Sequence, residues 1–114
     1  MAIKIPYYVH LMADFVTDHI IDEPKQIKKI LFTAARKANN TPLKASVHKF
    51  APHGITGVIL LAESHIAIHS WPEYNYVAVD IFTCGRKTRP HRAIEYLKYK
   101  FKAKQVNIKE IKEG

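Results

Sequence analysis

The residues best suited to chemistry lie in two short segments of the chain. The first segment runs from Leu61 to Glu73 and contains a single Glu63-Ser64 pair followed by two histidines, and the second ends at the only cysteine, Cys84. An imidazole can move protons near neutral pH, and a thiol can donate a proton or act as a nucleophile. The pattern alone leaves ordinary roles open, because Glu-Ser can be a polar turn and a histidine and a cysteine on neighbouring strands are more often structural.

Two common kinds of catalytic centre are not indicated. His65 and His69 share one face of an expected strand, but residues four apart on a strand are separated by roughly 13 Å, too far to bind one ion together. The chain also has no paired-cysteine or HExxH pattern, so we predict no metal site. A serine hydrolase is not indicated either, because a GxSxG motif is missing and no third group is evident that would orient a cysteine–histidine pair.

The hydrophobic pattern predicts the elements that would position these residues. Alternation within the segment after Ser64 puts Ile66 and Ile68 on one face of a strand and His69 and Trp71 on the other. Glycine inside the preceding apolar segment indicates a close backbone approach. The expected strands cover residues 4–15, 43–50, 55–62, 65–71, 76–84 and 105–111. One helix is expected to about Ala38 with Asp22 as N-cap and Pro24 in its first turn, and another with Thr88 as cap, Pro90 near its start and an apolar stripe of Ile94, Leu97 and Phe101.

This order, β-α-β-β-β-β-α-β, predicts an α+β fold. Four consecutive strands joined by short turns indicate antiparallel pairing. Two amphipathic helices can then cover one face of the sheet, which gives a two-layer α/β sandwich whose other face stays partly free. A chain of 114 residues without an internal boundary is expected to form a single domain, residues 1–114.

The formal net charge of +8 raises the question of an acidic partner. The basic residues are spread over two helix faces and the C-terminal part, and no aromatic-rich nucleic-acid signature accompanies them, so we expect no nucleic-acid partner. No apolar run approaches the roughly 18 residues of a membrane span, and the N-terminus lacks a signal-peptide pattern. With one cysteine, which cannot form an internal disulfide, we expect a cytoplasmic protein.

Three segments together carry a specific resemblance. They are SVHKFAPHGITGV (46–58), LAESHIAIHSWPE (61–73) and VDIFTCG (79–85). This combination closely resembles the short prokaryotic S-adenosylmethionine decarboxylase proenzymes, pyruvoyl-dependent enzymes of polyamine synthesis. The resemblance covers residues 46–85 without a gap and is weaker on both flanks.

The resemblance implies that the chain cuts itself between Glu63 and Ser64. The serine hydroxyl would attack the preceding carbonyl to give an ester, and elimination followed by hydrolysis would leave a pyruvoyl group. The products would be a β chain, residues 1–63, and an α chain, residues 64–114, that carries this group. His69 matches the histidine that serves as proton acceptor in processing. Thr56 stands where the family often has a serine that supports processing, and it keeps the hydroxyl.

The resemblance also implies the roles of the remaining residues. The pyruvoyl carbonyl would form a Schiff base with the substrate amine and act as an electron sink, as pyridoxal phosphate does in other enzymes. Cys84 matches the cysteine that returns a proton to the α-carbon. Phe50 and Trp71 match aromatic positions of the nucleoside site, and Glu73 matches a glutamate that accepts hydrogen bonds from the ribose.

The resemblance also implies a substrate and an oligomeric state. The implied reaction converts S-adenosylmethionine to its decarboxylated form, the aminopropyl donor for spermidine, and a homodimer with active sites near the subunit boundary is expected. Relatives that decarboxylate arginine or ornithine on the same scaffold are the alternative. The chain departs from the family in two places: Tyr8-Val9-His10 stands where many members have Gly-Arg-His, so that only His10 matches, and the C-terminal part is short.

Overall fold

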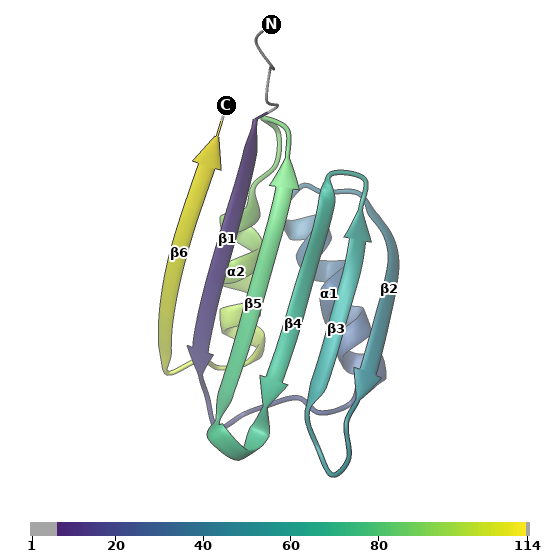
Figure 1. Ribbon diagram of the computed structural model, residues 1–114, viewed down its shortest axis with the longest axis vertical. Helices are drawn as coiled ribbons and strands as arrows, with labels where there is room; N and C mark the ends of the chain where they lie inside the picture. Colours follow the sequence, from purple (N-terminus) through teal and green to yellow (C-terminus); the bar gives the residue numbers. More distant parts are fainter. Residues whose placement is uncertain (1–6, 114) are drawn as a thin grey trace, which may run out of the picture.

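The computed structural model describes residues 7–113, and the order of its elements is the predicted one (Figure 1). The first strand, expected from Lys4, begins at Tyr8. Residues 1–6 lie outside the described part of the chain, and they include the start of the expected strand and the segment searched for a signal peptide. The elements are β1 (Tyr8–Val16), α1 (Pro24–Lys37), β2 (Pro42–Lys49), β3 (Ile55–Leu61), β4 (Ser64–Trp71), the 3-10 turn η1 (Pro72–Tyr74), β5 (Tyr76–Cys84), α2 (Pro90–Lys100) and β6 (Gln105–Glu113).

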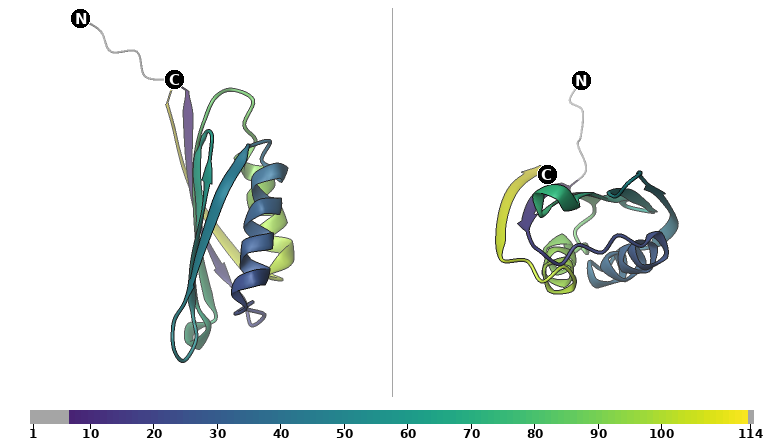
Figure 2. Two further views of the ribbon diagram at one scale, coloured as in Figure 1. Left: turned by 90° about the vertical axis from the view of Figure 1, so that its right-hand side faces the viewer. Right: turned by 90° about the horizontal axis from the view of Figure 1, so that it is seen from below.

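The six strands form one antiparallel sheet in the order β2-β3-β4-β5-β1-β6. Both helices lie on the same side of this sheet, and no helix of residues 7–113 lies on the opposite side (Figure 2). The two-layer α+β sandwich expected from the sequence is therefore confirmed. In the described residues, no helix is both long and apolar enough to cross a membrane.

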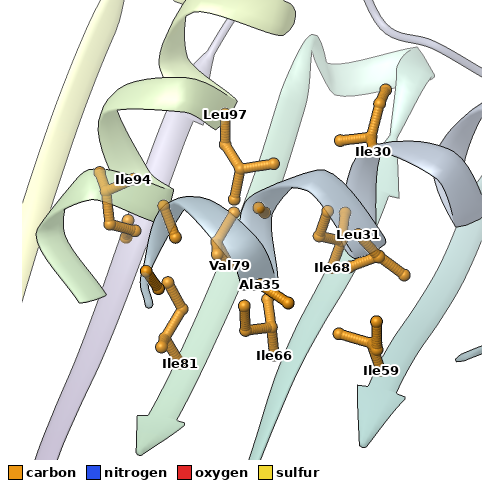
Figure 3. Packing of buried hydrophobic residues seen from close by; sticks show 14 of the residues in the cluster. Ile30, Leu31, Ala35, Ile59, Ile66, Ile68, Val79, Ile81, Ile94 and Leu97 are labelled. Atoms are coloured by element: carbon orange, nitrogen blue, oxygen red, sulfur yellow. The ribbon is translucent and has the colours of Figure 1, made fainter. Parts of the chain in front are cut away.

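The core fills the space between the sheet and the helices (Figure 3). The inward faces of β3, β4 and β5 meet the apolar stripes of the helices. Each fully buried leucine or isoleucine contributes about 1.5–3 kcal/mol. The labelled residues at this junction are Ile30, Leu31, Ala35, Ile59, Ile66, Ile68, Val79, Ile81, Ile94 and Leu97. Gly57 lies under α1, where an added Cβ would come within 3.2 Å of the Ile27 and Leu31 side chains, so the predicted close approach is confirmed.

Both helix caps predicted from the sequence are wrong. Glu23, not Asp22, is the N-cap of α1, and its carboxylate accepts from the Lys25 N–H. Asp22 instead accepts from the Gly54 N–H at 3.0 Å, which ties the β2–β3 loop to the segment before the helix. Thr88 does not cap α2 because its hydroxyl lies in a buried polar cluster, 2.9 Å from an amide nitrogen of Asn40.

We call the side of the sheet without helices the open face. It carries the side chains that could take part in a reaction. Its central part is formed by alternate residues of two adjacent strands: His65, Ala67, His69 and Trp71 on β4, and Ala78, Asp80, Phe82 and Cys84 on β5. The prediction that His69 and Trp71 project from one strand beside the strand that ends in Cys84 is confirmed.

Candidate active site

The predicted site residues gather at opposite ends of the open face. We call Glu63, Ser64 and Cys84 the cleavage end; it lies where the β3–β4 hairpin meets the end of β5, at the top of Figure 1. We call Phe50, Thr56, His69, Trp71 and Glu73 the pocket end; it lies where the β2–β3 loop meets η1, at the bottom of Figure 1.

At the cleavage end, the backbone around Ser64 is strained. Ser64 is the first residue of β4, directly after the hairpin turn, and has φ +148°, a conformation that residues with a side chain rarely adopt. Such a conformation costs about 1–3 kcal/mol and persists only where its surroundings enforce it. Part of that enforcement comes from Glu63, whose carboxylate accepts from the Thr41 N–H at 2.9 Å and from its hydroxyl at 3.1 Å.

The carbonyl before Ser64 is held by a hydrogen-bond donor. The backbone N–H of Cys84 donates to the Glu63 carbonyl oxygen at 3.0 Å. A donor in this position stabilises negative charge that develops on the oxygen when the carbonyl carbon is attacked. The hairpin thus presents a serine hydroxyl, a strained backbone and a polarised carbonyl at one peptide bond.

The Ser64 hydroxyl has an imidazole as neighbour. It lies 3.2 Å from His65 Nδ1, and His65 Nε2 lies 3.2 Å from one carboxylate oxygen of Asp80. The other Asp80 oxygen lies 2.6 Å from His10 Nε2. Phe82 lies between the two imidazoles and stacks on His65 at 6.2 Å. A continuous chain of polar contacts therefore runs from the hydroxyl across β4, β5 and β1.

Asp80 is the centre of this chain and is ionised. Partial burial alone would raise its pKa, but hydrogen bonds from His10 and His65, together with the positive charge of these rings when protonated, hold the pKa below its ordinary value. A carboxylate between two imidazoles fixes the nitrogen that carries the proton in each ring. In His65 this leaves Nδ1, the atom facing Ser64, free to accept.

At the pocket end, all five predicted residues line one cavity of about 350 Å³. Its size lies in the range of small-molecule sites. Phe50 and Trp71 are half exposed, 49% and 40%, so both rings are accessible to a bound molecule. Two larger hollows of about 650 Å³ lie over the helices and contain none of the predicted residues.

The polar groups of the pocket are paired. Thr56 and His69 face each other across β3 and β4, with Thr56 Oγ1 3.2 Å from His69 Nδ1. At the mouth, His53 Nε2 lies 3.6 Å from a Glu73 carboxylate oxygen. The pocket thus offers two aromatic faces, an imidazole oriented by a hydroxyl, and an acceptor carboxylate, a set that suits a nucleoside with a hydroxylated sugar.

Within one chain the two ends do not meet. Ser64 and His69 are five residues apart on the same strand, a separation of about 16 Å at the usual rise of a strand. Ser64 is paired with Thr83, and His69 with Ala78, so the neighbouring strand does not shorten this distance. His69 therefore lies far from the serine of its own chain.

Comparison with known proteins identifies the family of the chain. The profile of the S-adenosylmethionine decarboxylase family matches residues 9–114. This chain belongs to the S-adenosylmethionine decarboxylase family. It is 42% identical over 111 residues to the S-adenosylmethionine decarboxylase proenzyme of Pyrococcus furiosus, covering 96% of this chain and 79% of the relative. It is 46% identical over 101 residues to the proenzyme of Acidithiobacillus ferrooxidans, covering 89% and 68%.

A solved structure extends the agreement to three dimensions. The crystal structure of the adenosylmethionine decarboxylase from Aquifex aeolicus VF5 superposes with a TM-score of 0.84 at 36% identity, covering 96% of this chain and 92% of that chain. The decarboxylase fold is thus present over nearly the whole chain.

Sequence reasoning missed three residues that the structure brings to the candidate site. His65 was considered only as a metal ligand, and Asp80 and His53 were not considered at all. Asp80 could have been noticed as the single acidic residue of an apolar strand, facing away from the core. His53 lies in the 46–58 segment that carries the resemblance, but its contact with Glu73 follows from the loop conformation, which the hydrophobic pattern does not predict.

Proposed function

We propose that this chain is a self-cleaving, pyruvoyl-dependent decarboxylase that converts S-adenosylmethionine to its decarboxylated form, the aminopropyl donor of polyamine synthesis. The observation that carries the proposal is the peptide bond between Glu63 and Ser64. A strained serine whose preceding carbonyl accepts an N–H from Cys84 is suited to attack that carbonyl with its own hydroxyl. Nothing in the fold or the comparisons favours arginine or ornithine as substrate.

The residues fit a pyruvoyl group formed from Ser64. Cleavage would give chains 1–63 and 64–114, with the new group at the start of β4 and the Cys84 side chain on the adjoining strand end. When present, the group supplies a carbonyl that withdraws electrons from the substrate α-carbon. Cys84 is half buried and carries a free thiol, and we assign it the return of the proton to that carbon.

The pocket end would bind the nucleoside part of the substrate. Phe50 and Trp71 offer the surfaces for stacking an adenine ring, and Glu73 accepts hydrogen bonds from ribose hydroxyls. The carboxylate also attracts a cationic sulfonium, which matters because the protein's net charge of +8 repels a cation at long range.

The distance between the two ends leads us to infer a homodimer. A two-fold dimer that pairs the open faces would place the cleavage end of each chain against the pocket end of its partner, and so complete two sites at once. The open face is suited to such contact, since Leu60, Phe50 and Trp71 on or beside it are 51%, 49% and 40% exposed in the single chain.

The experiment that tests the proposed function is the mass of the purified protein followed by an assay for carbon dioxide. We expect two chains, 1–63 and 64–114, with the longer N-terminal one unmodified and the other blocked at its first residue. Carbon dioxide should be released from S-adenosylmethionine and little from arginine or ornithine. A single uncut chain after prolonged incubation, or the reverse substrate preference, would contradict the proposal.

Replacing Cys84 with alanine should separate cleavage from decarboxylation. The donor on the Glu63 carbonyl is the backbone N–H of residue 84, which alanine keeps, so the chain should still cut itself. Loss of a positioned proton donor should slow decarboxylation by about 10²–10⁴-fold. Cleavage is followed by mass and turnover by carbon dioxide release, with Cys84→Ser as the matched variant that keeps a weaker donor. Normal turnover in Cys84→Ala would remove the thiol from the mechanism.

A further inference from the structure

We propose that His65, oriented by Asp80, is the base that takes the Ser64 hydroxyl proton in the first step of self-cleavage. This rests on the proposed function, because it assigns a role within the cleavage at Glu63-Ser64. It concerns the attack of the hydroxyl and leaves the later elimination to His69.

Of the imidazoles of His65, His69 and His10, only that of His65 is placed to act on Ser64 of the same chain. His65 Nδ1 lies 3.2 Å from the hydroxyl oxygen, within the reach that a general base requires. His69 lies about 16 Å further along β4. His10 is bound to the far oxygen of Asp80, so it faces the carboxylate and not the serine.

Asp80 makes the proposed base competent. His65 can accept a proton at Nδ1 only if its other nitrogen carries the hydrogen, and that nitrogen lies 3.2 Å from an Asp80 oxygen. The carboxylate holds this tautomer and stabilises the imidazolium that forms when the proton arrives. His10, at 2.6 Å, fixes the orientation of the carboxylate from β1. Asp80 and His10 are thus positioning residues, which act through His65.

The step balances without any further reactant. The Ser64 oxygen forms a bond to the Glu63 carbonyl carbon while its proton passes to His65 Nδ1. Negative charge develops on the carbonyl oxygen, where the Cys84 N–H donates. The bond between that carbon and the Ser64 nitrogen then breaks, and the nitrogen takes the proton back from His65. The product is an ester isomer of the same chain, with the imidazole restored.

The test measures the rate at which newly made protein is cut. It also determines whether the full-length chain that accumulates has a peptide bond or an ester between Glu63 and Ser64. Hydroxylamine at neutral pH cleaves an ester and leaves an ordinary peptide bond intact. In His65→Ala we expect cleavage about 10²–10⁴-fold slower than in the natural chain, and the full-length protein that remains should resist hydroxylamine. In His69→Ala, which is blocked at the later step, full-length protein should be split by it. His91→Ala, which removes an exposed histidine of α2 paired with Glu110, is the matched control and should be cut at the natural rate.

Asp80→Asn provides an independent test that leaves the imidazole in place. An amide can donate to the ring and so favour the wrong tautomer, which should slow cleavage and again leave hydroxylamine-resistant protein. Asp80→Glu, which keeps the charge, should be cut faster than Asp80→Asn. If His65→Ala does not fold, Asp80→Asn decides.

Three results would overturn the assignment: cleavage of His65→Ala at the natural rate, cleavage of Asp80→Asn at the natural rate, or a full-length His65→Ala chain that hydroxylamine splits. Each of these is distinct from failure of the proposed function, in which the unaltered chain itself would remain uncut.

Discussion

Replacing Ser64 with alanine should give a folded, full-length chain that is never cut after Glu63 and releases no carbon dioxide from S-adenosylmethionine. The attacking hydroxyl is gone, so the ester cannot form and no carbonyl is made at the start of β4. Because that carbonyl is the proposed electron sink, the loss of decarboxylation should be complete. The intact mass of the purified variant and release of labelled carbon dioxide measure the two effects.

The fold should survive this change. Alanine has the same Cβ as serine, so it meets the same backbone cost at φ +148°, and the hydroxyl contributes only its contact with His65, worth about 0.5–1.5 kcal/mol. Ser46→Ala, at an exposed serine of β2, is the matched control and should be cut and active. A Ser64→Ala chain that still splits, or that still turns over substrate, would eliminate Ser64 as the precursor of the electrophile.

The sequence was sufficient to predict which residues share the open face. Side chains on a strand alternate between its two faces, so the pattern after Ser64 places His69 and Trp71 on the same face. The short turn that follows Trp71 makes the apolar strand ending in Cys84 the neighbouring strand. The same reasoning predicted the helices and the antiparallel order. These features depend on local pattern, which the sequence contains directly.

The partners of Ser64 could not be predicted in the same way. Whether Asp80 lies near His65 depends on the register between β4 and β5, which is set by the connection through η1 and the left-handed residue Asn75. One residue more or less in that connection would move Asp80 to another neighbour or face. The caps failed for a related reason: Asp22 is used by a loop distant in the sequence, a contact that no local pattern contains.

The proposed division of the site between two chains has a consequence that a single-chain site would not share. Ser64→Ala and His69→Ala should each be inactive alone, yet their co-expression should restore activity. In a mixed dimer, one site combines the intact cleavage end of the His69→Ala chain with the intact pocket end of the Ser64→Ala chain. If half of the dimers are mixed and each has one good site of two, about a quarter of the natural activity should return.

The chain that is cut in the mixture identifies the arrangement. Self-cleavage should occur only in the chain that carries His69→Ala, because its Ser64 meets the His69 of the partner. Different tags on the two variants allow isolation of mixed dimers and assignment of the fragments by mass.

Co-expression of Ser64→Ala with Cys84→Ala is the matched control. Both changes lie at the cleavage end, so neither site of the mixed dimer is complete and decarboxylation should not exceed that of Cys84→Ala alone. Purified mixed dimers of Ser64→Ala and His69→Ala that stay uncut would contradict a shared site. His69 would then have to act on the Ser64 of its own chain, and the chain would have to rearrange to close the distance of about 16 Å between them.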